Sequence, residues 1–129
     1  MGKYGAAAVE AANLCRHGLA ESPLDAWEQA TARLFGLGTS SQCKGCPKGA
    51  FLGLCEEGLV EGVEPGHYTQ SWDNKRYAVD AVAILRQRPW LSGNQSRLWA
   101  EVMAGETKKH NSQMDVVTAL WNAGLIQAR

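Results

Sequence analysis

Three segments of this 129-residue chain share one helix-ending motif, a leucine followed four residues later by Gly-Leu. The motif spans residues 14–19, 54–59 and 120–125. Its glycine adopts the left-handed conformation that stops a helix, and its second leucine is expected to pack back on the first. Three such ends predict an all-α protein. Only residues 58–63, ahead of the Pro65-Gly66 turn, favour a short strand.

Signals for helix starts supply the remaining boundaries. Ser22 before Pro23, with Asp25 in the first turn, is typical of an N-cap. Ser112 with Asp115 three residues later resembles a capping box. Together with the apolar spacing, these signals predict six helices. We expect them over about residues 4–17, 23–35, 46–57, 73–87, 95–104 and 112–123.

Landmark residues recur in the same order in the two halves of the chain. The matched positions are Tyr4 with Tyr77, Trp27 with Trp99, Ser41-Gln42 with Ser112-Gln113, and residues 58–60 with 124–126. This order predicts two similar three-helix, helix-turn-helix-like units, residues 1–72 and 73–129, within a single domain 1–129. Chance similarity between helical segments rich in Ala, Leu and Trp is the alternative.

The charges divide at the same boundary. The chain has 13 basic and 13 acidic side chains, which excludes a strongly basic or acidic protein overall. Residues 1–72 hold 5 basic and 8 acidic side chains, whereas residues 73–129 hold 8 basic and 5 acidic ones. The basic second half indicates either an anionic partner or mutual attraction of the two halves.

Nothing in the first residues predicts secretion, because Glu10, Asn13 and Arg16 interrupt any apolar core of a signal peptide. No stretch approaches the roughly 18 apolar residues of a membrane span. We therefore expect a cytoplasmic protein without membrane contact, whose four cysteines are thiols. Cys15 and Cys55 fit buried positions on helices.

Residues 107–113 form the strongest candidate binding site. They include Lys108, Lys109, His110, Asn111, Ser112 and Gln113. A helix N-terminus offers free N–H groups and the positive end of the helix dipole, which suit a phosphate. If the partner is DNA, Asn111 and Gln113 could read base edges while the lysines contact phosphates. A capped surface helix with a solvated lysine pair is the alternative.

The corresponding stretch of the first half, residues 38–49, contains Ser41, Gln42 and Lys44 among small polar residues. Such a segment exposes backbone N–H groups to an anion, although it lacks the spacing of a nucleotide-binding loop. A long helix connection is the alternative. We predict a non-enzymatic binding protein, without cofactor, whose two Ser-Gln segments form one surface for nucleic acid or a phosphorylated ligand.

Cys43 and Cys46 form a CxxC pair, which supports an alternative metal or redox function. A zinc site would need two more ligands, and Cys55 with His17 or His67 are the available residues. The sequence contains no second CxxC and no recognisable catalytic motif. We therefore expect no bound metal and no catalytic residues.

Five tryptophans suggest a further alternative, a protein-interaction module. Trp27, Trp99 and Trp121 lie beside apolar helical positions and fit the core. Trp72 and Trp90 lie at helix boundaries, where either could contact a partner or pack a corner.

The strings GTSSQ and CPKGAFLGLCEEGLV within residues 38–60, and KKHNSQMDVV at 108–117, resemble those of a small bacterial family of unknown function. The resemblance extends over most of the chain and implies a small, stand-alone bacterial protein. It implies no activity, substrate or catalytic residue.

Overall fold

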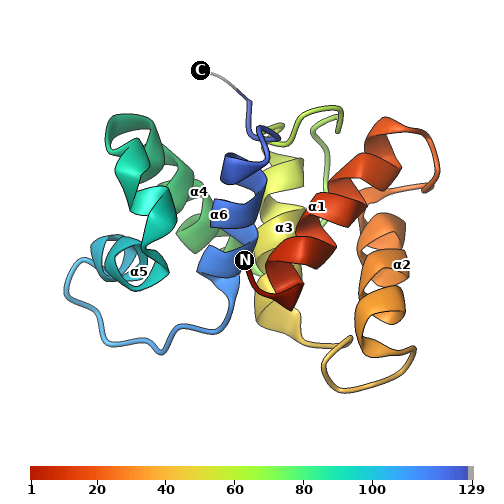
Figure 1. The fold of residues 1–129 in the computed structure, drawn as a ribbon, viewed down its shortest axis with the longest axis horizontal. Helices are drawn as coiled ribbons and strands as arrows, with labels where there is room; N and C mark the ends of the chain where they lie inside the picture. Colours follow the sequence, from red (N-terminus) through yellow and green to blue (C-terminus); the bar gives the residue numbers. More distant parts are fainter. Residues whose placement is uncertain (128–129) are drawn as a thin grey trace.

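Six α-helices and one 3-10 helix form the regular structure of residues 1–127, the part of the chain that the computed structural model describes. The α-helices are α1 (Lys3–Arg16), α2 (Pro23–Phe35), α3 (Gly45–Glu56), α4 (Trp72–Gln87), α5 (Gln95–Met103) and α6 (Gln113–Asn122), with η1 (Pro89–Gly93) between α4 and α5 (Figure 1). The all-α prediction is confirmed. None of the described helices is long and apolar enough to cross a membrane.

The repeated Gly-Leu motif ends α1, α3 and α6 as predicted. Its glycines, Gly18, Gly58 and Gly124, have φ angles of 69°, 71° and 73°. The N–H groups of Leu19, Leu59 and Leu125 donate to the carbonyls of Leu14, Leu54 and Leu120 at 2.9, 3.0 and 2.9 Å. This bond closes a helix end. The expected leucine packing fails at Leu19, which is 65% exposed.

Both predicted helix starts are confirmed, but only one of the two predicted side-chain caps forms. Ser22 accepts a hydrogen bond from the Asp25 N–H at 3.1 Å and caps α2. Ser112 precedes α6 in a left-handed conformation and makes no side-chain cap. The capping box fails because Asp115 binds the N-terminus of α1 instead: its carboxylate accepts from the N–H groups of Gly2 and Gly5, both at 2.7 Å.

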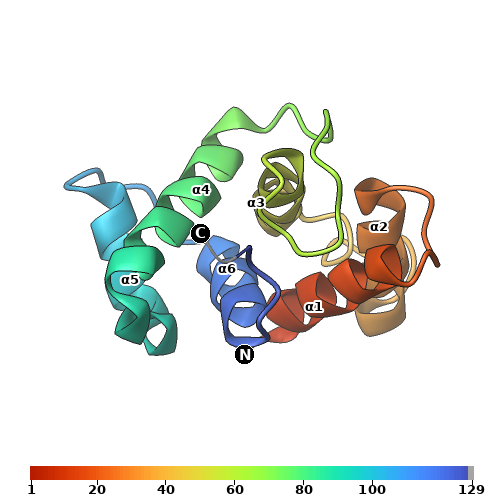
Figure 2. The same cartoon turned by 90° about the horizontal axis from the view of Figure 1, so that it is seen from above.

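Helices α3 and α6 run side by side through the middle of the molecule, with α1 and α2 on one side and α4 and α5 on the other (Figures 1 and 2). Each central helix packs against the first helix of the other half, α3 on α4 and α6 on α1. Both central helices begin at the same end of the molecule (Figure 1).

Where α3 and α6 end, the two halves pair through their backbones. Val60 and Ile126 form an isolated antiparallel bridge. The Glu61 N–H donates to Leu125 at 2.8 Å, and the Gln127 N–H donates to Leu59 at 2.9 Å. The short strand expected over residues 58–63 is therefore reduced to this one bridge, because the chain turns away after Val60.

The core lies where these helices meet, and it contains Trp27 and Trp99 as predicted, whereas Trp121 is only partly buried. Helix α3 approaches α4 closely at Gly53, where an added Cβ would lie 2.7 Å from the Lys75 Cα. Real Cβ atoms do not reach such distances, so this crossing requires glycine.

Candidate functional site

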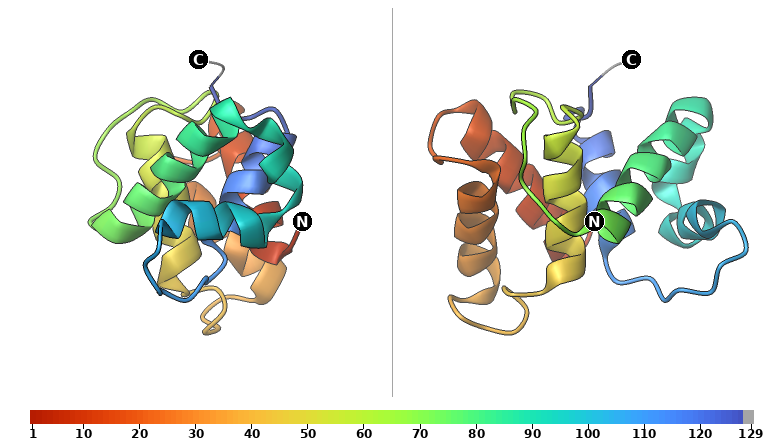
Figure 3. Two further views of the ribbon diagram at one scale, coloured as in Figure 1. Left: turned by 90° about the vertical axis from the view of Figure 1, so that its left-hand side faces the viewer. Right: turned by 180° about the vertical axis from the view of Figure 1, so that it is seen from behind.

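The two Ser-Gln segments lie at the same end of the molecule, where α3 and α6 begin (Figure 1, lower edge; Figure 3, right). We call the surface formed by residues 41–48 and 107–113 the Ser-Gln face. Because α3 and α6 run in the same direction, their first turns both point to this face. Their dipoles therefore add there instead of cancelling.

A pocket of about 330 Å³ opens on this face beside the first turn of α3. Residues from both halves line it: Lys44, Gly45, Cys46, Lys48, Gly49, Leu52, Thr69, Ser71 and Asn111. We call it the α3 pocket. It brings Lys44 from the first Ser-Gln segment together with Asn111 from the second.

The first turn of α3 carries unused donors. Its N-cap residue, Lys44, makes no side-chain cap. Within the described residues, the N–H groups of Gly45 and Cys46 have no hydrogen-bond acceptor. Uncapped N–H groups at a helix start bind anions when these are present.

Tyr4 of α1 holds the first segment in place. Its hydroxyl donates to the Ser41 carbonyl at 2.7 Å, and the Lys44 ammonium lies 5.5 Å from the centre of its ring. Lys44 and Lys48 make no ion pair with any described residue. Both positive charges therefore remain available to a ligand.

The glutamines of the two Ser-Gln strings face inward. Gln42 is 7% exposed, accepts from the Gly38 N–H at 2.7 Å and donates to the Glu28 carbonyl. Gln113 is 2% exposed, accepts from the Asn111 N–H at 2.7 Å and donates to Asn74. These side chains order the loops, and their amides are already occupied.

The two lysines before α6 differ in their surroundings. The Lys108 ammonium lies 3.7 Å from the Asp73 carboxylate and 5.6 Å from the centre of the Tyr77 ring. The backbone carbonyl of Lys108 accepts from the Trp99 indole at 3.1 Å. Lys109 is exposed and forms no ion pair with the described residues. The Lys109 charge is therefore more available to a ligand than the Lys108 charge, which Asp73 partly neutralises.

His110 caps α6 in place of Ser112. Its Nε2 accepts from the Met114 N–H at 3.2 Å, and its ring packs on Trp99. Burial lowers the pKa of His110, and the nearby Asp115 partly opposes this effect. The cap requires the neutral ring, because a protonated Nε2 cannot accept a hydrogen bond.

We expect stability to fall as the pH drops below about 6.5, the ordinary pKa of histidine. At such pH values His110 binds a proton more readily in the unfolded chain than in the folded protein, so acid favours unfolding. Urea denaturation at several pH values measures this loss. In His110→Gln the loss between neutral pH and pH 5 should shrink. An unchanged pH profile in this variant would show that His110 is not responsible.

The CxxC pair lies on the Ser-Gln face, with Cys43 exposed and Cys46 half-buried at the α3 pocket. Cys55 is buried near the far end of α3. Among residues 1–127, no three His, Cys, Asp or Glu side chains come together as a metal site would require.

Four residues at or near the site were not singled out from the sequence. Lys48, Thr69 and Ser71 line the α3 pocket. Glu56 was not singled out either. Its carboxylate accepts from the N–H groups of Tyr68 and Thr69 at 2.7 and 3.1 Å and forms an ion pair with Lys75. These contacts fix the segment of residues 57–71 along α3 (Figure 3, right). The only signal in the sequence was the acidic pair at 56–57, which no local rule links to Thr69.

Trp72 and Trp90, the tryptophans at helix boundaries, are 68% and 70% exposed. The Lys75 ammonium lies 5.3 Å from the centre of the Trp72 ring. Neither tryptophan lines the α3 pocket.

Comparison with known proteins identifies a family. No curated protein and no solved structure is similar to the chain. One protein family matches residues 1–127, and it is described as "Family of unknown function (DUF6979)".

Proposed function

The chain belongs to DUF6979, a family of unknown function, and we propose that it is a non-enzymatic binding protein for a phosphate-bearing partner. The observation that carries this proposal is the α3 pocket, where Lys44 and Lys48 of one half lie with Asn111 of the other around the start of a helix. The partner is a nucleic acid or a phosphorylated ligand.

The chemistry of the pocket suits a phosphate group. The free N–H groups of Gly45 and Cys46 would donate to phosphate oxygens, as helix starts commonly do. Lys44 and Lys48 would add point charges, and the Asn111 amide would add a neutral donor. The first turn of α6 begins at the same face and adds its helix dipole, which the Asp115 carboxylate in that turn partly offsets.

We do not expect this site to distinguish between the base sequences of nucleic acids. The Gln42 and Gln113 amides are hydrogen-bonded inside the fold, so base-edge contacts would depend on Asn111 alone. Lys109 lies outside the pocket and could contact a second phosphate of an extended chain. Binding with strong salt dependence and little sequence preference is the expected behaviour.

The test compares two double variants that each remove two positive charges. We expect Lys44→Gln/Lys48→Gln to weaken binding of a short single-stranded oligonucleotide and of inorganic pyrophosphate about tenfold or more, because two phosphate contacts are lost. Arg86→Gln/Arg97→Gln, on exposed faces of α4 and α5, should bind like the unaltered protein. Titration calorimetry or fluorescence anisotropy at several salt concentrations gives both values.

Equal weakening by the two double variants would contradict the proposal, because it would assign binding to overall charge instead of the α3 pocket. Lys108→Ala/Lys109→Ala adds a third arm. A loss for the oligonucleotide but not for pyrophosphate in this variant would indicate an extended partner that reaches the second Ser-Gln segment.

The same proposal includes two three-helix units, residues 1–72 and 73–129. Two observations support these units. The last helix of each unit packs on the first helix of the other, α3 on α4 and α6 on α1, and Val60 pairs with Ile126. The proposal also includes a cytoplasmic location, supported by four cysteines that are free thiols.

A further inference from the structure

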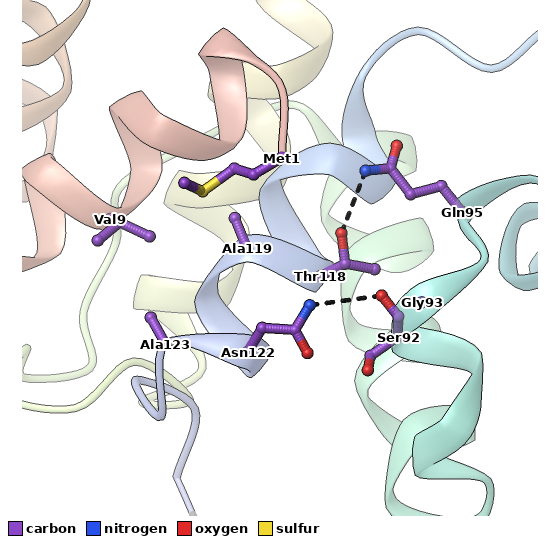
Figure 4. A pocket seen from close by; sticks show the side chains of 9 residues that line it. All are labelled: Met1, Val9, Ser92, Gly93, Gln95, Thr118, Ala119, Asn122 and Ala123. Atoms are coloured by element: carbon purple, nitrogen blue, oxygen red, sulfur yellow. Dashed lines mark hydrogen bonds between the residues drawn. The ribbon is translucent and has the colours of Figure 1, made fainter.

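A second cavity, of about 460 Å³, lies between the start of α1, the outer face of α6 and the η1–α5 connection (Figure 4). Its volume falls within the range of small-molecule sites. None of its lining residues lines the α3 pocket, so it is a separate feature of the molecule.

The cavity exists because the side chains that face it are small. Ala119 of α6 and Ala123, directly after this helix, form its floor, and Gly93 leaves its rim without a side chain. Val9 of α1 and Met1, which precedes this helix, form an apolar wall. These groups offer a ligand a flat apolar contact on one side.

The opposite wall carries amide groups in fixed positions. The Gln95 amide nitrogen lies 3.2 Å from the Asp115 carboxylate and 3.3 Å from the Thr118 hydroxyl. The Asn122 amide nitrogen lies 3.4 Å from the Ser92 carbonyl (Figure 4). Within the described residues, the amide oxygens of Gln95 and Asn122 accept no hydrogen bond.

The charges around the cavity favour a neutral ligand. No charged side chain lines it. Asp115 lies behind Gln95, is 7% exposed, and already accepts from the N–H groups of Gly2 and Gly5. Met1 contributes its α-ammonium group, but the adjoining Gly2 binds the Asp115 carboxylate, so the two charges offset each other and a charged ligand would lose its hydration without gaining a strong counter-charge.

We propose that this cavity binds a neutral, planar ring that carries a hydrogen-bond donor beside an acceptor, as in a nucleobase or a ring carboxamide. The ring would lie against Met1, Val9 and Ala119. Its polar edge would pair with the Asn122 amide, which offers one acceptor oxygen and one remaining N–H, and with the Gln95 amide oxygen, because both N–H groups of Gln95 are already bound.

The test uses matched probes on the full chain. Nicotinamide and pyridine share a ring and differ by the carboxamide, and adenosine carries the corresponding edge on a nucleobase. We expect nicotinamide or adenosine, but not pyridine, to shift the side-chain amide signals of Gln95 and Asn122 saturably in nitrogen-15 NMR spectra. A preference for one of these two probes identifies the source of the shared edge.

Two variants should weaken this binding at least tenfold. Asn122→Leu removes the polar edge at an exposed position, and Gly93→Leu fills the rim, where a Cβ meets no atom within 4 Å. Gln87→Leu, an exposed amide at the end of α4, is the matched control and should change nothing. Equal binding of pyridine and nicotinamide, or no saturable shift with any probe at millimolar concentration, would overturn the proposal.

Discussion

Replacement of Asp115 by alanine is expected to lower the free energy of unfolding by about 3 kcal/mol. The carboxylate is 7% exposed and accepts from the N–H groups of Gly2 and Gly5 and from the Gln95 amide. Alanine would leave these donors without a partner where α1 meets α6. For a domain of this size, the melting temperature should fall by about 10 °C.

Thermal and urea denaturation measure this loss of stability, and two other variants serve as controls. Asp115→Asn keeps one acceptor oxygen and should cost clearly less than alanine. Asp80→Ala removes a half-exposed carboxylate on α4 and should cost well under 1 kcal/mol. A similar small loss for Asp115→Ala would mean that Asp115 does not join α1 to α6.

Glu56→Gln is expected to destabilise the protein at neutral pH by about 2–3 kcal/mol. The carboxylate pairs with Lys75 at 2.6 Å and accepts two backbone N–H groups from residues 68 and 69. The Lys75 hydrogen bond, followed by that of the Tyr68 N–H, lowers the pKa of Glu56 from 4.5 to about 2. Glutamine keeps the shape but loses the charge that all three donors face.

The pH dependence of this contribution has a definite sign. Because the pKa of Glu56 is lower in the folded protein, its stabilisation is complete above pH 4.5 and is lost as the pH falls from 4.5 toward 2. Glu56→Gln should therefore lose less stability between pH 7 and pH 3 than the unaltered protein. Glu57→Gln, at a half-exposed carboxylate that also contacts Lys75, is the control and should retain the acid-induced loss. An unchanged acid-induced loss in Glu56→Gln would refute the assignment.

Local rules were enough to predict the six α-helices from sequence, but not the 3-10 helix η1. A glycine with a φ near 70° and a serine before proline are short-range features, so Gly58 and Ser22 marked their helix boundaries correctly. The same rules failed at Ser112, because Asp115 has a partner more than 100 residues away in Gly2. Long-range contacts of this kind leave no local signal.

The candidate site was predictable in part. Residues 107–113 and the segment around Lys44 were identified because helix starts with lysines suit anions. The α3 pocket itself depends on how α3 packs against α4, which brings Thr69 and Ser71 to the same place as Lys48. Nor could the sequence reveal that Gln42 and Gln113 turn inward.

The central claim is that one phosphate site forms between the two Ser-Gln segments. Titration of the nitrogen-15-labelled full chain with inorganic pyrophosphate, followed by NMR, tests this claim most directly. We predict that the backbone amides of Gly45 and Cys46 and the Asn111 side chain shift together, with a single dissociation constant. Shifts confined to one segment, or different constants for the two segments, would contradict it.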